Sequence, residues 1–132
     1  MASVVFDANA LIALVDSKNP FHSWAMRTYL SLTGEDLHIS TLTYAEVLVH
    51  PERAGKTSVF MKNLSKAGFR VEPLSDTDSV GLAKIRVTSK LKMPDAVVLH
   101  LAQSLGARIM TTDDQLIKAA NNQKIRVINM TR

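Results

Sequence analysis

Four acidic residues stand where a short apolar stretch of this sequence gives way to polar residues or to a helical pattern. Asp7, Glu46 and Asp113 each come shortly after such a stretch, and Asp95 opens a helical pattern that is apolar nearly all round. Four carboxylates brought together without a cation would repel one another strongly. Oxygen ligands, with no cysteine and no paired histidine spacing, favour a hard ion such as Mg²⁺ or Mn²⁺ over zinc.

The elements that would position these acids follow an alternating pattern. Short apolar or β-branched runs predict strands, and helical patterns lie between them. Alternation of this kind predicts a mainly parallel central sheet of four to five strands with helices on both faces, a three-layer α/β/α fold in one domain, residues 1–132. The predicted strands are Ser3–Phe6, Leu37–Ile39, Phe69–Val71, Ala107–Thr111 and Ile125–Ile128.

The helical patterns also predict which side chains face the core. Trp24 and Leu30 share one side of their segment, and Val80, Ala83 and Val87 recur at helical spacing. The predicted helices are Ala10–Val15, Phe21–Leu32, Thr43–Val49, Ser58–Ala67, Asp78–Lys90 and a buried Asp95–Leu105, the last capped by Gly106.

The first two acids each have a competing structural role. Asp7 or Asn9 could simply cap the helix that follows, since both residue types favour that position. Thr43 and Glu46 have the spacing of a capping box, in which the glutamate folds back onto the start of the helix. Considered one at a time, neither acid can be assigned to helix capping or to an active site from the sequence.

The other two acids are also open to a structural interpretation. Pro94 fits the first helical position, which places Asp95 in the first turn, where the helix dipole stabilises a carboxylate. Thr112 or Asp113 could cap the next helix, and the sequence leaves open whether Asp113 or Asp114 is the functional acid. Ligands of open parallel sheets bind at the carboxyl ends of strands. All four acids can therefore face one edge of one sheet, and their agreement favours a shared site.

Composition limits the class of protein. The chain has 132 residues, no cysteine, and 16 Lys and Arg against 12 Asp and Glu, for a formal charge of +4. Disulfides, thiolate metal sites and cysteine nucleophiles are excluded. A basic surface around an acidic pocket suits a polyanionic substrate whose chemistry needs a cation. The N-terminus lacks a cleavable-signal pattern and no apolar stretch could span a bilayer, so we expect a cytoplasmic protein with no membrane partner.

At the acidic positions the sequence resembles the PIN-domain ribonucleases, especially the VapC-type toxins of bacterial toxin–antitoxin pairs. Each matching stretch is short, but four of them in order across essentially the whole chain make a fairly specific pattern. The matching stretches are Val5-Phe6-Asp7-Ala8-Asn9, Ser40-Thr41-Leu42-Thr43-Tyr44-Ala45-Glu46, Pro94-Asp95-Ala96 and Thr111-Thr112-Asp113.

This resemblance implies roles for particular residues. Asp7, Glu46, Asp95 and Asp113 would be the catalytic and metal-binding acids; Asn9 and Thr111 would support them. The family's usual spacing after a threonine selects Asp113 over Asp114. The implied activity is Mg²⁺-dependent (or Mn²⁺-dependent) endonucleolytic hydrolysis of RNA that leaves 5′-phosphates. The resemblance also implies a cognate antitoxin and a homodimer.

Several other polar residues are candidates for a functional or a structural role. Lys90 and Lys92, just before Asp95, are the better candidates for RNA contacts, whereas Lys62 and Lys66 fit a solvated helix face. His100 lies in the predicted buried helix and is more simply interpreted as a hydrogen-bonded structural residue.

Other functions remain as alternatives. A phosphatase of the haloacid-dehalogenase type needs a second aspartate two residues after the first, and Asn9 occupies that position. A response-regulator receiver would not account for Glu46 or for Pro94 followed by Asp95. A degenerate PIN fold could serve as an RNA-binding or interaction module, although such modules usually lack one or more acids.

Overall fold

The computed structural model describes residues 2–128, so Met1 and the last four residues of the predicted 1–132 domain lie outside it. Five parallel strands form one sheet in the order β3-β2-β1-β4-β5. This confirms the predicted α/β fold with a central parallel sheet. The strands are β1 (Ser3–Phe6), β2 (Asp36–Ser40), β3 (Phe69–Glu72), β4 (Arg108–Met110) and β5 (Val127–Ile128).

Seven α-helices and one short 3₁₀ helix connect the strands within the described residues. None of the helices in this part of the chain combines the length and apolar character needed to cross a membrane. The helices are α1 (Ala8–Val15), α2 (His22–Ser31), α3 (Thr41–Arg53), α4 (Thr57–Lys66), the 3₁₀ helix η1 (Asp76–Asp78), α5 (Ser79–Ser89), α6 (Met93–Leu105) and α7 (Asp114–Asn122).

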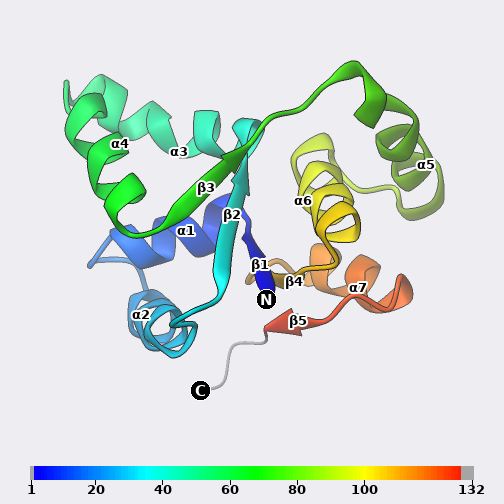
Figure 1. Cartoon of the computed structure of the whole chain (residues 1–132), viewed down its shortest axis with the longest axis horizontal. Coiled ribbons are helices and arrows are strands. Elements are labelled where there is room, and N and C mark those ends of the chain that lie inside the picture. Colours follow the sequence, from blue (N-terminus) through cyan, green and yellow to red (C-terminus); the bar gives the residue numbers. More distant parts are fainter. Residues whose placement is uncertain (1, 129–132) are drawn as a thin grey trace.

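Alternating side chains of the central strand β1 face two separate hydrophobic cores. Val4 and Phe6 pack with residues from α1 to α4 on one face of the sheet. Val5 packs with residues from α5 to α7 on the other face. The result is three layers, with α1 to α4 on the left of the sheet and α5 to α7 on the right in Figure 1. The two halves of the sequence therefore meet along the sheet.

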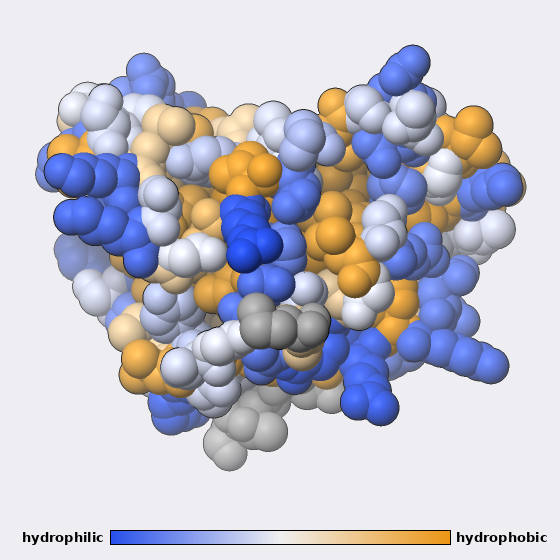
Figure 2. All heavy atoms as spheres, viewed as in Figure 1, coloured by the Kyte–Doolittle hydropathy of each residue, from blue (hydrophilic) through white to orange (hydrophobic). Residues whose placement is uncertain are grey.

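Some residues predicted to face the core lie on the surface instead. Trp24 is buried as predicted, but Leu30 is exposed. On α5, Val80 and Val87 are 66% and 81% exposed, and the buried side chain is that of Ile85. Figure 2 shows hydrophobic atoms reaching the surface at the end of the molecule where α5 lies. Helical spacing correctly predicted that these side chains share a helix, but it did not predict which side of the helix packs against the core.

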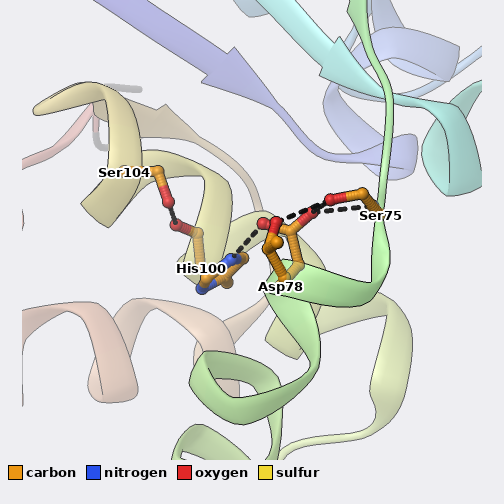
Figure 3. Close-up of polar contacts among 5 residues, drawn as sticks. Ser75, Asp78, His100 and Ser104 are labelled. Atoms are coloured by element: carbon orange, nitrogen blue, oxygen red, sulfur yellow. Dashed lines mark hydrogen bonds and ion pairs between the residues drawn. The ribbon is translucent and has the colours of Figure 1, made fainter.

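His100 of α6 has the structural role that its position predicts. Its Nε2 lies 2.9 Å from the Asp78 carboxylate, at the last residue of η1 (Figure 3). The other carboxylate oxygen of Asp78 accepts a hydrogen bond from the backbone N–H of Ser75 at 2.8 Å. These hydrogen bonds hold the pKa of Asp78 below its usual value. The network fixes the start of α5 against α6, the helix that carries Asp95.

Gly81 gives this network a testable steric requirement. A Cβ atom at Gly81 would lie 2.5 Å from Cε1 of His100, closer than real Cβ contacts. We therefore expect Gly81→Ala to lower the free energy of unfolding by about 1–3 kcal/mol through overpacking. In a His100→Ala background the same change should be stabilising by up to about 1 kcal/mol, because alanine is the better helix former. Urea unfolding of the four proteins measures both effects, and equal destabilisation in the two backgrounds would contradict the explanation.

Candidate functional site

Asp7 is a buried carboxylate held at the junction of β1 and α1. It is the N-cap of α1, and its Oδ1 accepts a hydrogen bond from the backbone N–H of Ala10 at 2.8 Å. Only 4% of the residue is exposed. Capping and chemistry are therefore compatible at this position, since the second carboxylate oxygen remains available for another partner.

Thr111 connects the first and last of the four acids. Its hydroxyl donates a hydrogen bond to Oδ2 of Asp7. The same hydroxyl oxygen accepts a hydrogen bond from the backbone N–H of Asp113 at 3.0 Å. Thr111 is completely buried just after β4, so the bridge is shielded from water. This side chain fixes the end of β4 and the start of α7 relative to Asp7.

Glu46 does not take part in the capping box that its spacing predicted. Helix α3 begins at Thr41 with Ser40 as its N-cap, and the Ser40 hydroxyl accepts a hydrogen bond from the backbone N–H of Thr43 at 3.0 Å. Glu46 therefore lies beyond the first turn of α3, where its carboxylate has no capping role. The capping-box interpretation is wrong, and Glu46 instead lines a cavity together with residues of α6.

Asp95 and Asp113 both stand at the starts of helices. Asp95 is in the first turn of α6, which begins two residues earlier than predicted, at Met93. Asp113 is the N-cap of α7, and its Oδ1 accepts a hydrogen bond from the backbone N–H of Leu116 at 3.0 Å. Asp113, rather than Thr112, is therefore the cap.

Two adjoining cavities bring the four acids to one region. A small cavity of about 90 Å³ is lined by Asp7, Glu46 and Asp95, together with Asn9. A larger one of about 420 Å³ is lined by Glu46, Asp95 and Asp113. Glu46 and Asp95 line both cavities. The acids thus come from β1, α3, α6 and α7 to the carboxyl edge of the sheet, as the strand topology predicts.

Burial and mutual repulsion make this region unfavourable for negative charge. Burial raises the pKa of Asp7 to about 6, and Asp95 and Asp113 add to the rise, against the opposing hydrogen bonds from Thr111 and Ala10. The pKa of Asp95 is also raised, first by burial and then by Asp113 and Glu46, while Lys92 opposes the shift. Burial raises the pKa of Glu46 as well. A bound cation would relieve all of these effects.

The donor chemistry of the site fits a hard divalent cation. Its charged donors are carboxylate oxygens, the ligands that Mg²⁺ and Mn²⁺ prefer, and the chain has no thiolate to compete. Within residues 2–128, no three acidic or histidine side chains already converge closely enough to hold an ion directly. Direct ligation by three acids would require side-chain rotation; otherwise water must complete the coordination, as is common for Mg²⁺.

The remaining predicted residues divide between this region and its surroundings. Lys92 lines the larger acidic cavity, but Lys90 lines a different one. Asp114 also lines the acidic cavity, yet it is exposed and, unlike Asp113, it is not a cause of the raised pKa of Asp7. Gln115 lines the same cavity and was not predicted. Its position two residues after Asp113, in the first turn of α7, is the signal that could have identified it.

The sequence matches the family model of the PIN domain over residues 4–122. The chain belongs to the PIN domain family. PIN domains are generally nucleases. No curated protein matches the chain significantly.

Solved structures with the same PIN fold include toxin–antitoxin systems. A toxin–antitoxin complex from Klebsiella pneumoniae contains a chain with a TM-score of 0.79 and 23% identity, over 98% of each chain. FitAcB from Neisseria gonorrhoeae has a TM-score of 0.75 and 20% identity over 96% of each chain. VapC20 from Mycobacterium tuberculosis, described as a sarcin-ricin loop cleaving toxin, has a TM-score of 0.74 and 15% identity, over 88% of this chain and 94% of that one. At these identities the likeness concerns the fold.

Proposed function

We propose that this PIN-domain protein is a metal-dependent endoribonuclease and the toxin of a toxin–antitoxin pair. The observation that carries the proposal is Asp7, a buried carboxylate whose pKa is raised to about 6 beside Asp95 and Asp113. The cap of α1 does not require a charged side chain, and repulsion among buried acids destabilises the fold unless a ligand of opposite charge binds them. Membership of a family of nucleases supports a phosphodiester substrate.

Asp7, Glu46, Asp95 and Asp113 would hold Mg²⁺ or Mn²⁺. When bound, the cation would lower the pKa of a coordinated water and stabilise negative charge on the phosphate. Asp7 is preoriented for binding because Ala10 and Thr111 hold its two oxygens. Thr111 would thus act as a positioning residue.

Two further polar residues would act on the substrate side of the site. Lys92, which lines the larger acidic cavity, would attract the phosphate backbone of RNA. Asn9 lines the small cavity beside Asp7 and would provide an uncharged donor and acceptor there.

An antitoxin partner is supported by an apolar groove beside the acidic site. The groove has a volume of about 820 Å³ and is lined by residues of α1, α3 and α4, including Val15, Val49 and Val59. Val59 is 62% exposed, and Glu46 lines both this groove and the acidic cavities. A segment of the antitoxin that covers these valines would therefore also reach the acidic site. A homodimer and a cytoplasmic location remain predictions.

Cleavage of a mixed RNA pool tests the proposal directly. In Mg²⁺ or Mn²⁺ the protein should produce fragments with 5′-phosphates, and EDTA should prevent their formation. Asp95→Asn should reduce the initial rate by roughly a thousandfold, because it removes a charged ligand. The product of an adjacent antitoxin gene, added to the same assay, should inhibit cleavage.

Asp114→Asn is the matched control for this assay. Asp114 is also an acid of the larger cavity, but it is exposed and outside the Thr111 bridge, so its variant should retain most of the activity. If Asp95→Asn cleaves as fast as the wild type, the assigned acidic site is wrong. If the wild type binds RNA but cleaves none with either metal, the alternative of a binding module takes precedence.

A further inference from the structure

A second polar cavity lies beside the acidic site, between the end of α5 and α7. Its volume is about 360 Å³, and its lining includes Lys90 and Lys118 together with the amide side chains of Gln115, Asn122 and Gln123. Among the residues that the structure describes, no acid lines it. It therefore differs in charge from the adjoining acidic cavity and suits an anionic ligand that also offers hydrogen-bonding groups.

One face of α7 forms a wall of this cavity. Gln115, Lys118 and Asn122 are spaced three and four residues apart, which places them on the same side of the helix. Leu116 and Ala120 turn the opposite side into the hydrophobic core. Packing of that apolar side fixes the rotation of α7, so the polar side chains are held toward the cavity.

The two cavities lie next to each other and share one lining residue. Gln115 lines both of them. Lys92 lines the acidic cavity, whereas Lys90, two residues earlier, lines the second one. A chain that leaves the acidic site past Gln115 would therefore next meet Lys90 and Lys118.

Lys90 adopts a backbone conformation that lysine rarely takes. It ends α5 in the left-handed region, with φ 58° and ψ 21°, where glycine is usual. Gly106 occupies the corresponding position after α6. Non-glycine residues in such conformations are uncommon and cluster at functional sites. A lysine at this position places an ammonium group at the cavity that a glycine would not provide.

We infer that this cavity is a subsite for single-stranded RNA next to the cleaved bond. Lys90 and Lys118 would contact the phosphates, and the amides of Asn122 and Gln123 would hydrogen-bond the edges of unpaired bases. Duplex RNA would bind less well because its base edges are already paired. The inference rests on the proposed function, since the acidic site defines where the bond is cleaved.

Lys90→Gly tests the subsite with an unusually close control. Lys124 is the other non-glycine residue of the described chain with positive φ, at 59°, and it does not line the cavity. Both Lys90→Gly and Lys124→Gly remove one positive charge and introduce the residue that the backbone favours. Both variants should fold, which thermal unfolding checks. Only Lys90→Gly should weaken RNA binding.

The measurement is binding of a fluorescein-labelled single-stranded oligoribonucleotide in EDTA at several salt concentrations. Lys90→Gly should raise Kd roughly fivefold, the upper range for an exposed charge contact. The slope of log K against log salt should become shallower by about 0.7, the value for one phosphate contact on a single strand. Lys124→Gly should match the wild type, and a duplex of the same sequence should bind more weakly.

Each outcome separates the subsite from the nuclease activity. Equal binding by all three proteins, equal weakening by both variants, or no binding by the wild type would overturn the subsite. Preferential binding of the duplex would also overturn it, because the base edges would not be read. If Lys90→Gly alone lost binding and the wild type showed no metal-dependent cleavage, the subsite would be supported and the proposed nuclease function contradicted. If the wild type cleaved RNA and Lys90→Gly bound RNA as tightly as the wild type, the nuclease function would be supported and the subsite contradicted.

Discussion

Replacing Asp7 with asparagine should abolish RNA cleavage and at the same time make the metal-free protein more stable at neutral pH. The pKa of Asp7 is raised from 3.8 to about 6, so its ionised form costs the folded state about 3 kcal/mol at about 1.4 kcal/mol per pKa unit. Asparagine carries no charge and can still accept the hydrogen bond from Ala10 that caps α1. Thr111 would lose an anionic acceptor, so we expect a net gain of about 1–2 kcal/mol.

Urea unfolding at pH 7.5 in EDTA measures the gain, and the cleavage assay in Mg²⁺ measures the loss, expected to be roughly a thousandfold or more. Asp16→Asn is the control, because Asp16 is an exposed aspartate at the other end of α1. It should change neither quantity appreciably. A destabilised Asp7→Asn variant would indicate that the carboxylate is primarily structural. Opposite changes in stability and activity are typical of a residue retained for function.

The stability of the wild-type protein without metal should fall as the pH rises from about 4 to about 6. The folded-state pKa of Asp7 lies above its unfolded value, so the folded state binds more protons within this window. The stabilisation is complete below pH 3.8 and is lost as the pH passes 6, a total of about 3 kcal/mol. The pKa values of Asp95 and Glu46 are shifted in the same direction and add to the fall.

Mg²⁺ should restore stability at pH 7.5 and have less effect at pH 4, where Asp7 is protonated in the folded state. Urea unfolding across this range, with and without Mg²⁺, gives the dependence. In Asp7→Asn most of the fall should disappear, which separates Asp7 from groups such as Asp78, whose lowered pKa acts in the opposite direction. The same pH dependence in the wild type and in Asp7→Asn would show that Asp7 does not have the assigned environment.

The sheet was predictable because its strands are short apolar runs between helical patterns. Ser3–Phe6 was predicted with its observed bounds, and each other predicted strand overlaps an observed one. Solvent exposure was harder to predict. Val80 and Val87 have helical spacing but lie on the uncovered side of α5. Periodicity identifies side chains that share a helix face, whereas burial depends on whether another element covers that face.

The position of the candidate site was predictable from the sequence, but some local details of the prediction were wrong. Strand ends in a parallel sheet bring Asp7 and Asp113 to one edge, which topology alone requires. The sequence could not decide whether Asp7 is a helix cap or a site residue, and the structure shows that the two roles are compatible. One carboxylate oxygen caps α1 through Ala10, and the other accepts the hydrogen bond from Thr111 at the acidic site. At Glu46 the predicted capping box was wrong, because β2 ends at Ser40 and the helix begins directly after it, with Ser40 as the cap.

The pairing of β1 with β4 has a consequence for the synthesis of this protein on the ribosome. The first strand of the chain lies at the centre of the sheet, and one of its two neighbours is β4, which ends at Met110. Asp7 acquires its Thr111 partner only when that late strand is in place. A nascent chain that has folded only its α1–α4 half therefore has Asp7 and Glu46 but lacks Asp95 and Asp113. If the protein is a nuclease, a nascent chain becomes active only after α6 and the start of α7 have been made, and shorter nascent chains lack the complete acidic site.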